Sequence, residues 1–91
     1  MTGNENTIYI GTKPTMNYVL ALVMQFHNHT KEIKIKARGK AISKAVDVVE
    51  IARNKFVKEM KVKNIEVNTE EITTDKGSRN VSTMTISIGK E

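Results

Sequence analysis

The segment EIKIKAR, residues 32–38, constrains the fold more than any other part of the chain, because charged and apolar side chains alternate in it without exception. In an extended strand, alternate side chains point to opposite faces, which separates Ile33, Ile35 and Ala37 from Lys34, Lys36 and Arg38. Such a strand is buried on one face only. The chain is therefore expected to build a sheet with a covered face and an open face.

The segments before this strand follow a strand pattern and then a helix pattern. TIYI (7–10) is a β-branched run closed by Gly11, which predicts a first strand. Residues 12–30 include Pro14, which suits a first helical turn, and are apolar around much of the helix circumference. They predict a helix that is covered on more than one side.

A second helix is predicted over residues 40–60. Its apolar residues recur at three- and four-residue spacing and form a stripe made of Ile42, Ala45, Val46, Val49, Ala52 and Phe56. Lys44, Asp47 and Lys55 fall outside the stripe, so the opposite side of this helix is polar.

The last third of the chain predicts a long β-hairpin. NIEVNTEEIT (64–73) and NVSTMTISIG (80–89) are joined by a polar stretch in which Gly77 supplies the turn. Strands of about ten residues span about 33 Å, and a small domain is about 30 Å across, so the tip is expected to overhang as an arm. The element order β-α-β-α-β-β predicts one α+β domain over residues 7–91, with a small mixed sheet, both helices on one face and a flexible tail over residues 1–6.

Composition excludes several classes of protein. Among the 91 residues, no apolar run approaches the roughly 18 residues of a membrane span, and the N-terminus has no signal-peptide pattern. We therefore expect a cytoplasmic protein. Because the chain has no cysteine, disulfides and thiolate metal sites are excluded, and no cofactor is expected.

Positive charge is concentrated in the middle of the chain. Residues 31–63 hold eleven cations and four acids, a balance of +7, whereas residues 1–30 are neutral and residues 64–91 carry −2. One basic face of this kind indicates a polyanionic partner. A solvated lysine surface is the alternative, since a net charge of +5 is also ordinary for solubility.

The cations gather where strands run into helices. Successive parallel strand–helix units bring their strand ends to one edge of a sheet, so GTKPT (11–15) and ARGK (37–40) are expected to meet there. Helix starts attract anions. Lys13, Arg38, Lys40 and Lys44 add positive charge at this edge, and Gly39 allows a bound anion to come close to the backbone. They predict a phosphate site.

A mononucleotide pocket is the competing interpretation of these cations. Neither G-x-G-x-x-G nor G-x-x-x-x-G-K-[ST] occurs in the chain, and no carboxylate is placed for ribose or magnesium. An extended nucleic-acid backbone therefore fits the spread of cations better.

The aromatic residues favour a duplex over a single strand as the partner. Only four are present, and Phe26 and Phe56 fall on apolar stripes. A protein that reads single strands needs exposed rings on a sheet face, and Tyr18 is the ring near the basic edge. We expect recognition of the duplex backbone and shape, with Lys76 and Arg79 at the arm tip reaching a minor groove.

Three stretches together resemble the Alba family of archaeal chromatin proteins: GTKPTMNYVLA (11–21), IKIKARGKAISKAVDVVEIARNKF (33–56) and RNVSTMTISI (79–88). The resemblance extends from Ile8 to Ile88 in the same order of elements. It implies a dimer that coats and compacts double-stranded DNA in the nucleoid with little sequence preference, that also binds RNA, and that can pair with a paralogue. It also implies that the helix junctions lie on the duplex backbone and the hairpin arms along the minor groove.

The resemblance assigns individual residues as well. Lys13 matches a family lysine that contacts DNA, and Arg38 and Lys40 match the basic pair around the glycine. Asn17 and Tyr18 match the start of the first helix, near the nucleic acid.

Two further assignments concern regulation and assembly. Phe56 matches the aromatic that family members use in dimer–dimer contacts along the duplex. Many members carry two adjacent lysines before the proline, and acetylation of the first weakens binding. Thr12 occupies that position here, so Lys13 would have to take over such control.

Other candidate functions have weaker support in the sequence. HNH (27–29) offers two metal ligands without a third, and Asp47 and Glu50 are spaced as ordinary neighbours on a helix surface. No catalytic set is assembled, so no enzyme activity is expected. The alternative function is an RNA-binding structural subunit of an RNA-processing ribonucleoprotein, with the apolar first helix as a heterodimer surface. A homodimer explains the same apolar excess.

Overall fold

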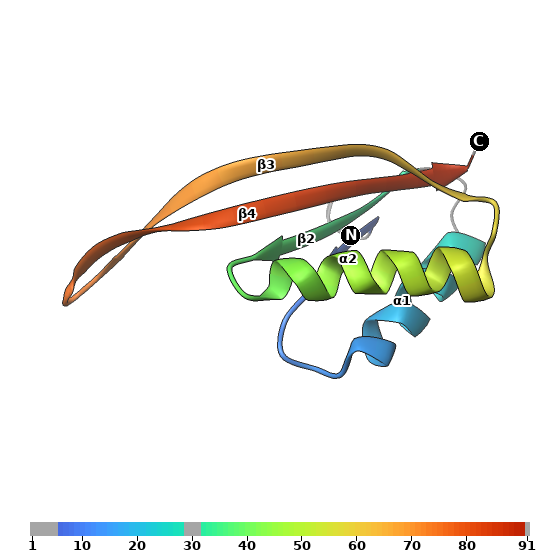
Figure 1. Ribbon diagram of the computed structural model, residues 1–91, viewed down its shortest axis with the longest axis horizontal. Helices are drawn as coiled ribbons and strands as arrows, with labels where there is room; N and C mark the ends of the chain where they lie inside the picture. The colour runs from blue at the N-terminus through green and yellow to red at the C-terminus, as the bar shows by residue number, and fades with distance from the viewer. Residues whose placement is uncertain (1–5, 29–31, 91) are drawn as a thin grey trace.

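Four strands form a single sheet in the order β1-β2-β4-β3 (Figure 1). The computed structural model describes residues 6–28 and 32–90, and its strands are β1 (Thr7–Tyr9), β2 (Ile33–Arg38), β3 (Met60–Thr74) and β4 (Gly77–Lys90). β1 and β2 are parallel, whereas β4 runs antiparallel to both of its neighbours. The predicted β-α-β-α-β-β order and mixed sheet are confirmed.

Both helices, α1 (Thr15–Asn28) and α2 (Ala41–Ile51), cover the same face of the sheet, as predicted (Figure 1). The alternation of β2 is confirmed, because its apolar residues are buried and its cations exposed. The largest fully buried side chains are Leu22, Ile33, Ile35, Met60, Ile88, Val19 and Val48. Each contributes about 1.5–3 kcal/mol through burial. The opposite face of the sheet carries no helix from the described residues.

The second helix ends earlier than predicted. α2 stops at Ile51, and Ala52–Phe56 form a π-helical turn, η2, in which the Val57 N–H donates to the Ala52 carbonyl oxygen at 2.8 Å. β3 begins at Met60. A π turn takes an extra residue, so a stripe drawn at 3.6 residues per turn loses its register here.

The prediction of which residues form the buried stripe of α2 was also partly wrong. Ala45, Val48 and Val49 are its buried residues, so the buried line passes through Val48 rather than Val46. Val46 is 42% exposed, and Phe56, beyond the end of α2, is 49% exposed.

The hairpin is longer than predicted. β3 has 15 residues and β4 has 14, and they pair from Met60↔Lys90 to Thr74↔Gly77. Gly77 takes a φ of 121°, which favours glycine, so it does supply the turn. The overhanging arm is confirmed, because the hairpin reaches far past the helices in a molecule 45 Å long (Figure 1).

Two expectations concern the ends of the chain and membranes. The tail predicted over residues 1–6 lies outside the described residues except for Asn6. Over residues 6–28 and 32–90, no helix combines the length and the apolar character that crossing a bilayer requires.

Candidate nucleic-acid interface

The two strand–helix junctions meet at one edge of the sheet, as predicted. β1 and β2 are parallel, and the Ile10 N–H donates to the Lys36 carbonyl oxygen at 2.9 Å, so both strands end side by side. Across the junctions, the Lys44 ammonium donates to the carbonyl oxygens of Gly11 at 3.2 Å and Lys13 at 2.8 Å. We call the edge formed by residues 11–14 and 38–40 the basic rim.

Gly39 shapes the second half of the basic rim. Its φ is 57°, in the left-handed region, and its N–H donates to the Ser82 carbonyl oxygen at 2.8 Å. A Cβ at this position would lie 3.6 Å from the nearest atom, on Val81, which is ordinary contact. Backbone conformation, rather than lack of space, therefore requires the glycine. α2 then starts from Lys40 without a side-chain cap.

Tyr18 shapes the first half of the basic rim. Its hydroxyl oxygen accepts the N–H of Gly11 at 2.9 Å and the N–H of Lys13 at 3.1 Å. A Cβ on Gly11 would lie 3.2 Å from that oxygen, so the loop approaches the phenol closely because residue 11 is glycine. The Tyr18 side chain is half-buried and holds the loop, so it is not an open ring on which a base could stack.

Lys44 lies at the two junctions, where the sequence predicted it, but it points inward to the loop. It is half-buried, its two hydrogen bonds go to loop carbonyls, and its ammonium lies 5.9 Å from the centroid of the Tyr18 ring. Lys44 therefore joins the two junctions instead of projecting outward. Lys13 and Lys40 are exposed on the basic rim, as are Thr12 and Asn17 beside them.

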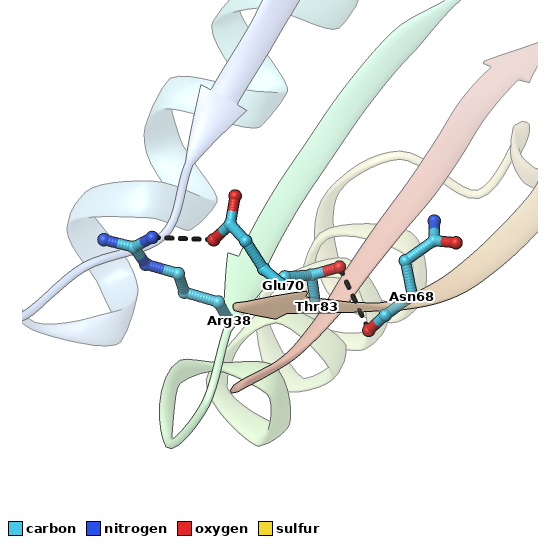
Figure 2. A network of polar contacts seen from close by, with 4 residues as sticks. All are labelled: Arg38, Asn68, Glu70 and Thr83. Atoms are coloured by element: carbon cyan, nitrogen blue, oxygen red, sulfur yellow. Dashed lines mark hydrogen bonds and ion pairs between the residues drawn. The ribbon is translucent and has the colours of Figure 1, made fainter. Parts of the chain in front are cut away.

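Arg38 has an acidic partner that the sequence did not reveal. Its guanidinium donates to the Glu70 carboxylate at 2.8 Å, reaching from β2 across β4 to β3 (Figure 2). The two side chains are 62% and 53% exposed, so the pair is well solvated. Such a pair contributes about 0.2–1 kcal/mol. The cost of freeing Arg38 for a phosphate is correspondingly small.

The arm tip lies at the far end of the hairpin, on the same side of the molecule as the basic rim but well beyond it (Figure 1). The turn at the tip is tied by Thr74, whose hydroxyl accepts the Lys76 N–H at 3.2 Å and donates to the Gly77 carbonyl oxygen at 3.1 Å. Lys76 and Arg79 are exposed. The structure does not bring these two cations to the basic rim.

Phe56 lies at the opposite end of the second helix from the basic rim, where η2 leads towards β3 (Figure 1). Its ring is about half exposed, so it is available for contact with another molecule without sharing residues with the basic rim.

The weaker candidates do not form a site in the described part of the chain. Glu50 forms an ion pair with Arg53 at 2.8 Å, an ordinary i,i+3 helix contact. His29, the second histidine of HNH, lies outside the described residues. Among residues 6–28 and 32–90, no group of three or more histidine or acidic side chains is close enough to hold a metal ion.

Comparison with known proteins gives a consistent result. A family model described as Alba matches residues 6–74. The chain is 54% identical over 86 residues to the DNA/RNA-binding protein Alba of Thermoplasma acidophilum, an alignment that covers 94% of this chain and 97% of that protein. It is 48% identical over 87 residues to DNA/RNA-binding protein Alba 1 of Archaeoglobus fulgidus, covering 96% and 98%.

Solved structures agree with the sequence comparison. The structure of Alba from Thermoplasma volcanium superposes with a TM-score of 0.87 at 52% identity and covers 92% of this chain and 99% of that chain. ALBA1 from Trypanosoma brucei is similar in fold, with a TM-score of 0.76 at 24% identity, covering 93% of this chain and 68% of that chain.

Proposed function

This chain belongs to the Alba family, and we propose that it binds double-stranded DNA through the basic rim, with little sequence preference, and that it also binds RNA. The observation that carries the proposal is the Lys44 bridge, which holds two cation-bearing helix starts at one edge. Relatives about half identical to this chain, named as DNA/RNA-binding proteins, support it.

The residues of the basic rim divide into contacting and positioning groups. Lys13, Arg38 and Lys40 neutralise backbone phosphates, and Gly39 allows the backbone to approach closely. Thr12 and Asn17 lie at the edge of the same contact, while Tyr18 and Lys44 hold the loop. Lys76 and Arg79 carry the contact along the duplex into a minor groove, because the arm extends beyond the body (Figure 1).

The proposed working unit is a homodimer. The described chain leaves large apolar side chains exposed on three elements, namely Met16, Leu20 and Met24 on α1, Val46 on α2, and Ile65 and Val67 on β3. Exposed large apolar side chains in this number favour a protein–protein contact. A second copy covers part of it, and Phe56 makes lateral contacts between dimers that coat and compact DNA.

Two experiments test duplex binding and assembly. If one dimer engages about six phosphates, affinity for a random duplex falls about a thousandfold between 50 and 200 mM salt. A flat salt response refutes the phosphate contacts.

Static light scattering of the wild-type protein, Leu20→Glu and Val67→Glu tests the dimer. Loss of the dimer in one of the two variants identifies the covered surface, and a monomeric wild-type protein refutes the proposed homodimer.

The alternative function is a structural subunit of an RNA-processing ribonucleoprotein. The names of the relatives include RNA, which keeps this candidate open. Competition between duplex DNA and a folded RNA decides between the two, because a preference for the RNA above about a hundredfold, or about 2.7 kcal/mol, reverses the ranking. In either role the protein acts by binding rather than by catalysis, and the DNA role places it on the nucleoid in the cytoplasm.

A further inference from the structure

The face of the sheet opposite the helices carries a row of cations along β2. Lys34, Lys36 and Arg38 all point to this face and are exposed. Residues two apart in a strand recur at about 6.6 Å, which is comparable to the spacing of phosphates in an extended nucleotide strand. The basic rim contains only the last of these three residues, so Lys34 and Lys36 have no part in the proposed duplex contact.

The strands beside this row carry polar groups in register with it. Lys36 pairs with Thr85 of β4, which pairs in turn with Glu66 of β3, and the next set across the same strands is Arg38, Thr83 and Asn68. Directly paired residues face the same side of a sheet. The face therefore presents a row of cations on β2, a row of hydroxyls on β4 and a row of hydrogen-bond acceptors on β3.

A groove of about 680 Å³ is lined by Lys36 and Arg38 of the cation row, by the hydroxyls of β4 and by the acceptors of β3, while Lys34 is not part of its lining. Its walls include Lys36 and Arg38 on one side and Glu66 and Glu70 on the other. Figure 2 shows Arg38 and Glu70 reaching toward each other, and Asn68 beside Thr83, whose hydroxyl donates to the Asn68 carbonyl oxygen at 3.3 Å. The volume falls in the range of ordinary ligand sites, large enough for one or two nucleotides and too small for a duplex.

An exposed aromatic ring lies at the edge of this groove. Tyr9 of β1 is directly paired with Lys36, lines the groove, and is 58% exposed. The sequence pointed to Tyr18 as the available ring, but that side chain holds the loop and Tyr9 is the ring on the sheet face. A ring open to solvent beside a row of cations is the arrangement on which single-stranded bases stack.

We propose that this groove is a second nucleic-acid site, which binds a single strand. In the groove the phosphates lie along Lys36 and Arg38, the strand continues past it to Lys34 on the same face of β2, and one base stacks on Tyr9. A duplex does not satisfy the groove, because its bases are already stacked and paired. Apart from Arg38, the site shares no contacting residue with the basic rim, so it stands independently of duplex binding.

The two carboxylates give the site a base preference. Glu66 and Glu70 repel phosphates but accept hydrogen bonds from exocyclic amino groups, as acidic side chains do from cytosine. Cytosine therefore binds better than uracil or thymine, which present a carbonyl oxygen at the same position. With about three phosphates engaged, affinity falls only about twentyfold between 50 and 200 mM salt, against about a thousandfold for the duplex.

The test measures fluorescence anisotropy of labelled eight-nucleotide oligo(C), as RNA and as DNA, and of a random duplex. Tyr9→Ala removes the stacking ring and is expected to weaken oligo(C) binding about 5- to 150-fold, since a stacked base contributes about 1–3 kcal/mol. Its effect on the duplex is expected to be under about twofold. Tyr9→Phe keeps the ring and is expected to keep oligo(C) affinity. The thermal midpoint of each variant establishes that it is folded.

Lys13→Ala is the matched control, since it is expected to weaken the duplex and spare oligo(C). Loss of oligo(C) binding by Tyr9→Ala in RNA, in DNA or in both supports the proposal and shows whether the sugar matters. Unchanged oligo(C) affinity in Tyr9→Ala overturns it, as does an equal loss of oligo(C) binding in Lys13→Ala. Duplex binding is measured on the same variants, so failure of this site is distinct from failure of the basic rim.

Discussion

In the proposed duplex contact, the ion pair between Arg38 and Glu70 is expected to make the duplex affinity depend on an acidic residue of the arm. Because the Glu70 carboxylate lies 2.8 Å from the Arg38 guanidinium, it offsets the positive charge and competes with a phosphate for it. Glu70→Gln removes the competing charge and leaves a side chain of almost the same shape. We therefore expect the substitution to strengthen duplex binding.

The magnitude follows from the exposure of the pair. With side chains 62% and 53% exposed, the interaction belongs to the solvated class that contributes about 0.2–1 kcal/mol. Releasing it strengthens duplex binding about 1.4- to 5-fold for each Arg38 that contacts a phosphate. The measurement is the dissociation constant for a random duplex by fluorescence anisotropy at fixed salt.

Two controls separate release of Arg38 from a general change in charge. Glu71→Gln alters the same charge on the next residue of β3, which points to the opposite face, and is expected to strengthen binding less than Glu70→Gln. In an Arg38→Gln background, Glu70→Gln is expected to lose its effect. An equal gain with and without Arg38 refutes the competition.

Two further predictions concern the loop and the lateral contact. Tyr18→Phe removes the acceptor of the Gly11 and Lys13 N–H groups. Because each lost hydrogen bond costs about 0.5–1.5 kcal/mol, the free energy of unfolding measured in urea is expected to fall by about 1–3 kcal/mol. Duplex binding is expected to weaken as well. A fully stable variant with normal binding would show that the phenol does not hold the loop. Phe56→Ala is expected to leave binding to a duplex with room for one dimer nearly intact and to reduce the cooperativity of binding to long DNA. Unchanged cooperativity in a gel-shift titration would show that Phe56 does not make the lateral contact between dimers.

Much of the fold was predictable because its patterns are local. The alternation of β2 separates buried isoleucines from exposed lysines within six residues, and a parallel strand pair necessarily brings its two junctions to one edge. The overhanging arm followed from strand length alone, because strands of about ten residues span about 33 Å and a small domain is about 30 Å across.

The errors arose where a pattern changes or where contacts span the chain. The π turn over Ala52–Phe56 breaks the 3.6-residue period, so extrapolation carried the predicted helix as far as Met60, the first residue of β3, and kept Phe56 on the helix stripe. No local pattern marks where the first strand of the hairpin begins at Met60.

The partners of the candidate site residues could not be predicted from the sequence. Arg38 and Glu70 are 32 residues apart, and Lys44 is 33 residues from Gly11, so no spacing rule connects either pair. The same is true of Tyr9, whose place on an open face became visible only once both helices were found on the other side of the sheet (Figure 1).

The central claim is that the two junctions act as one phosphate-binding surface. Its most direct test is the salt dependence of duplex affinity for Lys13→Ala/Lys40→Ala, with Lys55→Ala/Lys58→Ala as a control of equal charge on exposed lysines beyond α2. In a dimer the first variant loses four contacts, so the slope of log affinity against log salt is expected to become shallower by about 3.6, while the control keeps the wild-type slope. Equal slopes for the wild-type protein and a folded Lys13→Ala/Lys40→Ala variant would contradict the account.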